Sequence, residues 1–334
     1  MSIVRVGFVG AGGMGRHHIG NIIKQADTTQ IAAICEPDKG AYARAAALFE
    51  QAGRPVPPNE PDFARFMSRR IKSFDVGFIN TPHNAHFEQT TALLEAGKDV
   101  LLEKPMVINA SQARRLIKTR DKTKRLLVVA FPGSLSPQIR RAAELLRSGE
   151  FGKLLTISGT VWQNWEQGTA GKWRQEPKIS GGGFMFDTGA HMLNTLADLA
   201  GEPFADVAAF LDNRRTKVDI LAVAIARLQS GALVSINGCG AAIPSCESDV
   251  KIFCEKAILE VGIWGGYLKV RRAGESQATP VDCGAWSGVW QTFMAVRNGQ
   301  MENPCPPEVG LRMAQLWDAI KASAKQNGMP VRVA

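Results

Sequence analysis

The sequence predicts an α/β protein in which a doubly wound parallel sheet is followed by a second domain with a large, mainly antiparallel open sheet. In residues 1–130, apolar strand patterns alternate with helical patterns, which is the order of a helix-covered parallel sheet. Beyond residue 205, short apolar runs follow one another across turn signals, as in antiparallel hairpins. The chain has 334 residues, more than one core usually supports, and we place the domain boundary between residues 128 and 129.

The composition is that of a globular protein, with 45% apolar and 21% charged residues. The formal net charge of +9 favours an anionic ligand such as a dinucleotide. The densest basic run, residues 114–125, contains Leu116 and Ile117 and no aromatic residue. We therefore interpret it as the solvated face of a helix and not as a nucleic-acid site. No apolar run approaches the ~18 residues that a membrane helix needs.

The six cysteines show no C-x-x-C pair and no metal-ligand spacing, so the sequence predicts neither a disulfide framework nor a metal site. Isolated thiols with apolar neighbours suit a reducing compartment. The sequence opens on a strand pattern without a signal segment ahead of it. We expect a cytoplasmic protein.

The most informative stretch is the glycine loop that follows the first strand pattern. Gly10, Gly12 and Gly15 have the spacing G-x-G-x-x-G, between an apolar run that starts at Val4 and a helical pattern over residues 14–25. The first glycine permits a tight turn, the second lets the backbone approach a pyrophosphate, and the third lets the helix pack closely on the strand. This context predicts a dinucleotide site.

Gly13 and Met14 complete the loop, and their N–H groups would bind phosphate at the helix N-terminus. The next strand, Gln30–Cys35, ends at Glu36. A carboxylate there would accept hydrogen bonds from both ribose hydroxyls and repel a 2′-phosphate, which favours NAD over NADP. The alternative is a structural βαβ unit whose glycines serve only the turn.

Other polar residues also stand where predicted strands of the first domain end. The strand 75–80 leads into Thr81 and Pro82, and the strand 99–102 leads into Glu103 and Lys104. The carboxyl ends of parallel strands share one edge of the sheet, where ligands bind. We therefore expect these four residues to surround one crevice with the glycine loop and Glu36. Helices are predicted over residues 39–51 and 87–96, with a proline-rich connection at residues 55–58.

Three residues carry the groups that acid–base chemistry requires. The ammonium group of Lys104 would hydrogen-bond a substrate oxygen; the alternative is an ordinary surface lysine. Asp187 and His191 are four residues apart, on one face of a helix, after the glycine run 181–183 that lets backbone approach a substrate. An unperturbed histidine has a pKa of about 6.5, which suits proton transfer from a hydroxyl. The alternatives are a helix cap at Asp187 and a core histidine at His191.

The chain resembles the glucose-fructose oxidoreductase, inositol dehydrogenase and rhizopine catabolism (Gfo/Idh/MocA) family over nearly its whole length. The motifs that carry the resemblance are GAGGMG at 10–15, NTPHNAHFEQTTALLEAGKDVLLEKPM at 80–106 and SGGGFMFDTGAHMLNTLADL at 180–199. The resemblance implies a Rossmann domain joined to an α/β domain with a large, mainly antiparallel sheet. It also implies an NAD(P)-dependent dehydrogenase or reductase of sugars, inositols or related polyols, and dimers or tetramers formed through the outer face of that sheet.

The same resemblance implies roles for individual residues. It places Lys104 at the substrate, before a Lys-Pro bond that is often cis, and makes Asp187 and His191 the D-x-x-x-H pair of the family. His86 matches a T-P-x-x-x-H pattern that lies near the nicotinamide. We expect His191 to accept the proton while Lys104 and Asp187 orient the substrate oxygen. Whether His191 or Lys104 is the immediate base stays open at this stage.

Further candidates for the substrate pocket are Trp162, Trp165, Trp173 and Arg174. They lie in a loop-rich stretch, where aromatic faces would pack on a sugar ring and a guanidinium would bind a hydroxyl or carboxylate. Core packing of the tryptophans is an equal alternative. His17 and His18, early in the first helix, are interpreted as structural.

Two segments depart from the family pattern. Residues 131–135 read Phe-Pro-Gly-Ser-Leu where many members have an aromatic residue and an arginine, and Asn194 stands where an acidic residue often follows the histidine. Both border the expected pocket, which makes the substrate less certain than the reaction type.

The second domain should contain two helices and a run of strands. The helices are expected over residues 136–148 and 308–327. The strands are expected over residues 154–162, 207–211, 219–228, 232–237, 249–254, 258–261 and 267–270. An antiparallel sheet with one uncovered face exposes apolar area, which predicts self-association.

Three other functions share these features. A redox-neutral glycosidase that uses bound NAD transiently would have the same fold. A non-catalytic NAD-sensing regulator would be expected to lose Lys104 or His191, and both are present. A structural nucleotide-binding protein would show no substrate-dependent absorbance change.

Overall fold

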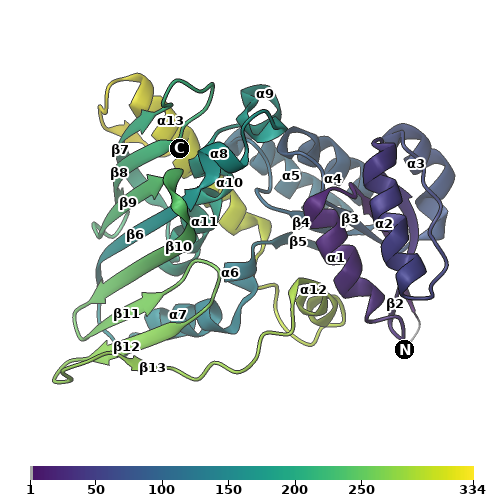
Figure 1. Ribbon diagram of the computed structural model, residues 1–334. Helices are drawn as coiled ribbons and strands as arrows, with labels where there is room; N and C mark the ends of the chain where they lie inside the picture. Colours follow the sequence, from purple (N-terminus) through teal and green to yellow (C-terminus); the bar gives the residue numbers. More distant parts are fainter. Residues whose placement is uncertain (1–2) are drawn as a thin grey trace. The chain divides into compact units, whose positions relative to one another are not determined.

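The computed structural model describes residues 3–334, which form two compact units (Figure 1). The first comprises residues up to 106 together with residues 114–130 and 289–303. The second comprises residues 107–113, 131–288 and 304–334. The chain enters the second unit at residues 107, 131 and 304 and returns to the first unit at residues 114 and 289, so neither unit is one continuous segment.

The first unit contains the expected parallel sheet. Its five strands have the order β2-β1-β3-β4-β5, and every neighbouring pair is parallel. The strands are β1 (Val4–Val9), β2 (Thr29–Cys35), β3 (Val76–Ile79), β4 (Asp99–Glu103) and β5 (Leu127–Ala130). The residues of β3 and β5 are buried throughout, because helices cover both faces of such a sheet.

The helices of this unit alternate with its strands. They are α1 (Gly13–Ile23), α2 (Lys39–Gln51), α3 (Phe63–Arg70), α4 (His86–Glu95), α5 (Ala110–Thr123) and α12 (Val289–Arg297), with the 3-10 turns η1 (Ile71–Ser73) and η2 (His83–Ala85). Side-chain caps fix where two of them begin, because Asp38 accepts the N–H of Ala41 and Asp62 accepts the N–H of Arg65. The first four residues of α5 belong to the second unit.

The proline-rich connection forms the outer edge of this sheet. The N–H of Ile34 donates to the carbonyl of Pro58 at 3.0 Å, and the N–H of Glu60 donates to the carbonyl of Ile34 at 2.9 Å. Proline cannot complete a ladder of hydrogen bonds, so the segment stays at a single bridge between Ile34 and Asn59.

Helix α12 had no counterpart in the expected elements, and it packs on the first unit. The Nε1–H of Trp290 donates to Thr29 Oγ1 at 2.9 Å, and the indole lies 6.3 Å from the ring of Phe78. Arg297 pairs with Asp99 at 3.0 Å. These contacts join residues about 200 positions apart in the chain, which local sequence patterns do not reveal.

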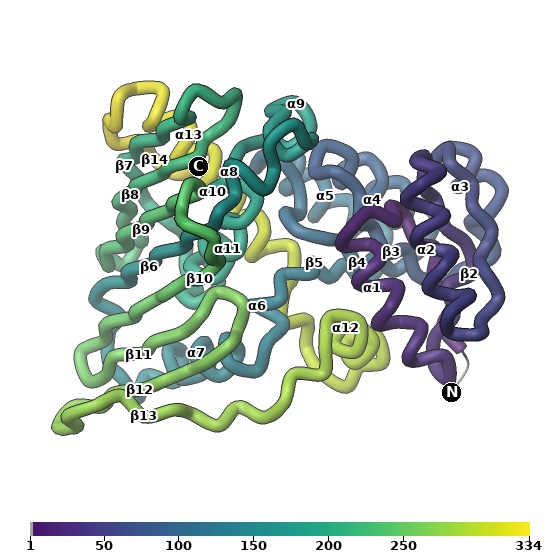
Figure 2. Tube along the Cα trace, in the orientation of Figure 1, coloured from purple at the N-terminus to yellow at the C-terminus, as the bar shows by residue number. Residues whose placement is uncertain are grey.

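The second unit contains a nine-stranded sheet with the order β13-β12-β11-β10-β6-β9-β8-β7-β14. The pairing is antiparallel except between β6 and β9. The strands, traced in Figure 2, are β6 (Leu154–Asn164), β7 (Phe204–Asp212), β8 (Leu221–Leu228), β9 (Leu233–Cys239), β10 (Ala241–Cys254), β11 (Ala257–Val261), β12 (Leu268–Arg272), β13 (Thr279–Pro280) and β14 (Val331–Arg332). The expected mainly antiparallel sheet is confirmed.

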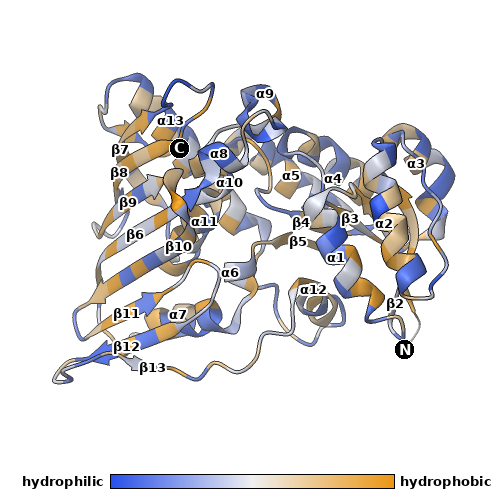
Figure 3. Ribbon diagram, in the orientation of Figure 1, coloured by the Kyte–Doolittle hydropathy of each residue, from blue (hydrophilic) through white to orange (hydrophobic). Residues whose placement is uncertain are grey.

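Helices cover one face of this sheet. Those that pack against it include α7 (Pro137–Arg147), α10 (Phe184–Asp187), α11 (Gly189–Ala200) and α13 (Pro307–Lys325). The unit also contains α6 (Pro132–Leu135), α8 (Trp165–Gly168), α9 (Pro177–Ser180) and the 3-10 turn η3 (Trp173–Gln175). Along β8, buried alanines alternate with exposed residues, so the strand has one covered and one open face. Apolar residues recur along these strands (Figure 3). No helix within residues 3–334 is both long and apolar enough to cross a membrane.

Candidate active site

The glycine loop joins β1 to α1 with the three geometries expected of a dinucleotide site. Gly10 has φ +89°, which an L side chain rarely adopts. A Cβ at Gly15 would lie 2.3 Å from the carbonyl oxygen of Gly10, so α1 can pack this closely only without a side chain. A Cβ at Gly12 would meet nothing within 4 Å. The space at Gly12 and the N-terminus of α1 therefore fit a pyrophosphate group, with Gly13 and Met14 in the first turn.

Glu36 follows β2 and faces the glycine loop. Its Oε2 accepts the N–H of Ala11 at 2.6 Å, and its Oε1 accepts the N–H of Asp38 at 2.9 Å. Each carboxylate oxygen has a second lone pair, so these bonds leave acceptors for ribose hydroxyls. The position and charge of Glu36 fit the adenosine half of NAD.

Lys104 lies at the same edge of the sheet, directly after β4, and its peptide bond to Pro105 is cis. Its N–H donates to Glu103 Oε2 at 3.0 Å. The other oxygen of Glu103 lies 2.6 Å from Nε2 of the buried His18. Glu103 was expected at the cofactor; its two oxygens contact His18 and the N–H of Lys104, so the contacts of this buried carboxylate support the lysine turn.

His86 is a correction to the expected cofactor set. Its side chain is fully buried, with Nδ1 at 2.8 Å from the carbonyl of Pro105 and Nε2 at 2.9 Å from the carbonyl of Thr81. Burial lowers the pKa of His86 against the opposing effect of the two carbonyls. The imidazole therefore holds the Thr81-Pro82 turn against the lysine turn and has no nitrogen left for the dinucleotide.

The Asp187 and His191 pair stands at the junction of α10 and α11. Thr188 between the two helices keeps helical dihedral angles, and the N–H of His191 donates to the carbonyl of Thr188 at 3.1 Å. The turn is therefore continuous, and the spacing of four places both side chains on one face. Both residues are buried.

The carboxylate of Asp187 is bound by two side chains from the preceding segment. Its Oδ2 accepts Nε1–H of Trp165 at 2.8 Å and Nε–H of Arg174 at 2.9 Å. Arg174 also lies 4.6 Å over the ring of Trp173. Arg174 was expected at the substrate, but its first partner is Asp187, because a buried carboxylate requires a donor or a cation. Trp165, one of the tryptophans expected near the substrate, thus contacts the carboxylate of Asp187.

Two aromatic side chains flank His191. The ring of Phe131 meets the imidazole edge-on at a centroid distance of 5.7 Å, and the half-buried Trp264 lies 5.8 Å away. Trp264 belongs to the loop 262–267 between β11 and β12, far from His191 in the sequence. Its pattern, an isolated tryptophan among glycines, gives no local signal of this contact.

The glycine run before Asp187 serves a different purpose from the one expected. Asp219 accepts the N–H of Gly183 at 2.7 Å and the N–H of Met185 at 2.8 Å. A Cβ at Gly183 would lie 2.0 Å from the carbonyl oxygen of Asp219. Burial raises the pKa of Asp219, although these N–H groups oppose the shift. Here the close approach is to the backbone of the protein itself, and it fixes the start of α10.

The structure does not bring Trp162 to this cluster. Along β6, Gly159 lies against Met192 of α11, and successive side chains point to opposite faces. Trp162 is out of phase with Gly159 and therefore projects toward the open face, whereas its neighbour Gln163 accepts the hydroxyl of Thr188 at 2.6 Å. We remove Trp162 from the candidate set.

The two departures from the family pattern lie side by side. Asn194 Nδ2 donates to Ser134 Oγ at 2.8 Å, and the hydroxyl of Ser134 donates to Asp198 at 2.7 Å. Both departures thus belong to one buried network on α11, next to the Phe131 that contacts His191. Asp198 is further bound by Arg140 and Arg147.

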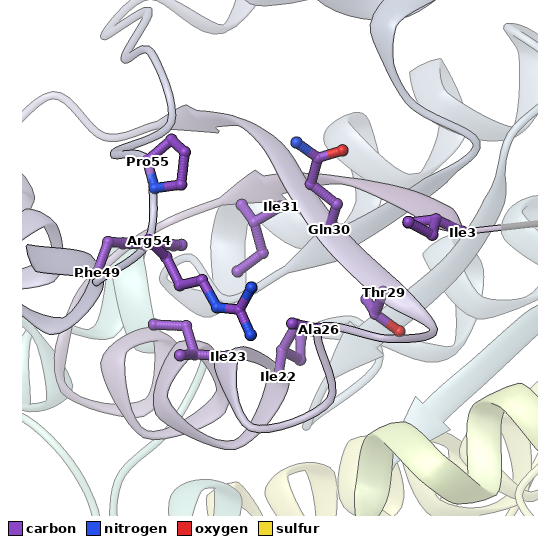
Figure 4. A pocket seen from close by; sticks show the side chains of 10 residues that line it. All are labelled: Ile3, Ile22, Ile23, Ala26, Thr29, Gln30, Ile31, Phe49, Arg54 and Pro55. Atoms are coloured by element: carbon purple, nitrogen blue, oxygen red, sulfur yellow. The ribbon is translucent and has the colours of Figure 1, made fainter. Parts of the chain in front are cut away.

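A pocket of about 270 Å³ in the first unit is not part of this site (Figure 4). It is lined mainly by apolar side chains, including Ile22, Ile31 and Phe49, with Arg54 among them. Thr29, at the amino end of β2, also lines it. The glycine loop follows the carboxyl end of the parallel strand β1, so the pocket and the loop lie at opposite edges of the sheet. Among residues 3–334, no three His, Cys, Asp or Glu side chains are arranged to hold a metal ion.

Comparison with protein families identifies both units. Residues 4–131 match the oxidoreductase family with an NAD-binding Rossmann fold, and residues 139–260 match the GFO/IDH/MocA C-terminal domain. The chain belongs to the Gfo/Idh/MocA family. The resemblance inferred from the three sequence motifs is confirmed.

Individual members of the Gfo/Idh/MocA family share parts of the chain. An inositol 2-dehydrogenase of Corynebacterium glutamicum (strain R) is 33% identical over 171 residues, which cover 49% of this chain and 48% of the relative. The rhizopine catabolism protein MocA of Rhizobium meliloti is 26% identical over 206 residues, 60% of this chain and 59% of the relative. The chain thus aligns with about half the length of these relatives.

Solved structures match the fold over the whole chain. Levoglucosan dehydrogenase in complex with NADH gives a TM-score of 0.84 at 22% identity, over 100% of both chains. The WlbA dehydrogenase from Bordetella pertussis, in complex with NADH and UDP-GlcNAcA, gives 0.83 at 22% identity, over 100% of this chain and 99% of the other. At such identity these similarities establish the fold.

Two substitutions in the glycine loop should distinguish an effect on NAD binding from an effect on stability. Gly12→Ala adds a Cβ into open space, so we expect unchanged thermal stability but a rise in the Kd of NAD of about tenfold or more, because the methyl group occupies the pyrophosphate position. Gly15→Ala is the matched control, and its clash with Gly10 should cost about 1–3 kcal/mol of stability. Calorimetric titration and thermal unfolding measure both. Wild-type NAD affinity in Gly12→Ala contradicts the assignment.

Proposed function

We propose that this chain is a dehydrogenase or reductase that transfers hydride between NAD and a CH–OH or C=O group of a sugar, inositol or related polyol. The chemical activities named for its relatives support this class, since they include inositol 2-dehydrogenase and D-xylose 1-dehydrogenase. NADP is the less favoured cofactor, because Glu36 carries a negative charge to the ribose position.

One observation carries the proposal. The open backbone at Gly12 and the side chain of Lys104 stand at the same carboxyl edge of one parallel sheet, after β1 and β4. A site for binding a dinucleotide alone has no need of an ammonium group at that edge. The arrangement is that of a cofactor site with a proton or hydrogen-bond donor beside it.

We assign the chemistry to three side chains. Bound NAD supplies the hydride acceptor in oxidation and, once reduced, the donor in the reverse direction. His191 takes the proton of the substrate hydroxyl, and Lys104 donates a hydrogen bond to the same oxygen. Asp187, held by Trp165 and Arg174, keeps a fixed negative charge next to His191 and stabilises the imidazolium that forms.

The three substrate contacts are therefore Lys104, His191 and the aromatic surface beside it. Phe131 and Trp264 flank the imidazole, and the flat apolar side of a cyclic polyol packs on such rings. Trp173 stays a candidate for the same purpose through its stacking with Arg174.

Loss of either basic side chain should stop the reaction without loss of the cofactor. We expect Lys104→Ala and His191→Ala each to lower kcat by about 10²-fold or more, the usual contribution of general acid–base groups. The Kd of NAD should stay near the wild-type value. The measurement is NADH formation at 340 nm with sugars, inositols and sugar acids, with NAD and NADP in parallel. Near-normal turnover in both variants would exclude the mechanism.

The open face of the nine-stranded sheet supports a homodimer or homotetramer as part of the proposal. Phe210, Val223, Ile225 and Leu233 project from β7, β8 and β9 with exposed fractions of 64%, 55%, 60% and 51%. Apolar side chains that stand this far out of a flat sheet favour burial against a second copy.

A charge on this face should separate the subunits. We expect Ile225→Glu to shift the mass in solution toward the 36.1 kDa of one chain, because it would bury a carboxylate without a partner in the interface. Ile3→Glu, the same change at a 50% exposed isoleucine of the first unit, is the control. Light scattering after size exclusion gives the mass. A monomeric wild type, or an oligomer that tolerates Ile225→Glu, contradicts this part of the proposal.

A cytoplasmic location is also part of the proposal. All six cysteines are free thiols. This is the state that a reducing compartment maintains, which supports the expectation made from their spacing.

A further inference from the structure

His18 is a buried imidazole that contacts Glu103, the residue before the candidate catalytic lysine. It stands in the second turn of α1, after the glycine loop, and only 5% of it is exposed. Its ring packs on Phe78 of β3 at a centroid distance of 4.8 Å. Its Nε2 lies 2.6 Å from Oε1 of Glu103, the last residue of β4.

Glu103 passes this contact on to Lys104. Its second oxygen, Oε2, accepts the backbone N–H of Lys104 at 3.0 Å. The carboxylate thus binds the helix α1 on one side and the lysine turn on the other. A carboxylate fixed at both oxygens fixes the plane of the Lys104 peptide group, and with it the direction in which the lysine side chain leaves the backbone.

The protonation states of this pair follow from its surroundings. Burial alone would raise the pKa of Glu103, but the hydrogen bond and charge of His18, with the charge and N–H of Lys104, lower it below its usual value. An ionised carboxylate can only accept hydrogen bonds, so His18 donates through Nε2–H. His86, a further titratable group near Glu103, lies between the carbonyls of Pro105 and Thr81, and burial lowers its pKa.

We propose that His18 is a positioning residue, which acts through Glu103 to set the direction of Lys104 and ties it to the helix whose N-terminus would bind the pyrophosphate. The inference rests on the proposed function of Lys104. A residue needed only for packing against Phe78 would be apolar at this depth. His18 instead supplies the one donor that Glu103 receives from α1.

The decisive variant is His18→Leu, which keeps the packing volume against Phe78 and removes the donor. We expect kcat to fall by about 10- to 100-fold, the cost of misplacing a catalytic group by about 1 Å. The Kd of NAD should change by less than about threefold. His18→Gln, whose amide N–H can still donate to Glu103, should restore most of the loss. His17→Leu, at the exposed neighbour on the same helix, is the matched control and should behave as wild type.

The pH profile separates positioning from packing. Without His18, burial dominates and the pKa of Glu103 rises, so Glu103 becomes protonated as the pH falls. The turnover of His18→Leu should then fall more steeply than that of the wild type as the pH is lowered, and His18→Gln should reduce this difference. A loss of the same size at every pH, without rescue by His18→Gln, would indicate a packing role and overturn the proposal.

A second readout does not depend on turnover. Acylation of lysines, followed peptide by peptide in a mass spectrometer, reports the setting of the Lys104 amine, with Lys98 of the same unit as internal reference. The rate at Lys104 should change severalfold in His18→Leu while the rate at Lys98 does not. Equal rates at Lys104 in both proteins overturn the inference. If the wild type shows no NAD-dependent turnover, but His18→Leu still changes the acylation rate at Lys104, only the proposed function is overturned.

Discussion

The close packing of helix α1 on the end of strand β1 is the contact on which the first unit depends. It exists because Gly15 has no side chain: a Cβ at Gly15 would lie only 2.3 Å from the carbonyl oxygen of Gly10. Once α1 lies this close, the backbone at Gly12 is open to a ligand, and Ala11 is within reach of Glu36. The same helix places His18 next to Glu103. One steric constraint thus links the cofactor loop with the lysine turn.

The second unit uses a buried carboxylate for a comparable purpose. The carboxylate of Asp219 accepts the backbone N–H groups of Gly183 and Met185, and so fixes where α10 begins. That start determines where Asp187 and His191 stand, and Trp165 and Arg174 then hold Asp187. In both units, therefore, a buried acid accepts backbone N–H groups at or near the residues assigned to the reaction. Glu103 accepts that of Lys104, and Asp219 accepts those of Gly183 and Met185.

Local patterns predicted most of the fold, since strand alternation, glycine spacing and helix caps act over a few residues. Helix 39–51 has its expected bounds, and most strands lie within a few residues of theirs. Strand β10 begins at Ala241 and not at residue 249, and β13 and β14 were not expected. The expectation that ligands bind at the carboxyl ends of parallel strands also placed Lys104 and Glu36 at the same edge of the sheet. What the sequence did not reveal depends on contacts between distant segments, such as Trp264 beside His191 and α12 beside β3. The T-P-x-x-x-H pattern of His86 does not state which way its side chain points, and neither does the stretch of sequence around Trp162, which lies on β6.

A crystal structure of the protein with NAD and an oxidisable polyol tests the central claim most directly. The account predicts that the pyrophosphate lies on the N–H groups at Gly12 to Met14. It also predicts that the Lys104 amine and a ring nitrogen of His191 both lie within about 3.2 Å of one substrate oxygen. A complex in which Lys104 and His191 contact different ligands, or in which the pyrophosphate binds away from the glycine loop, would contradict it.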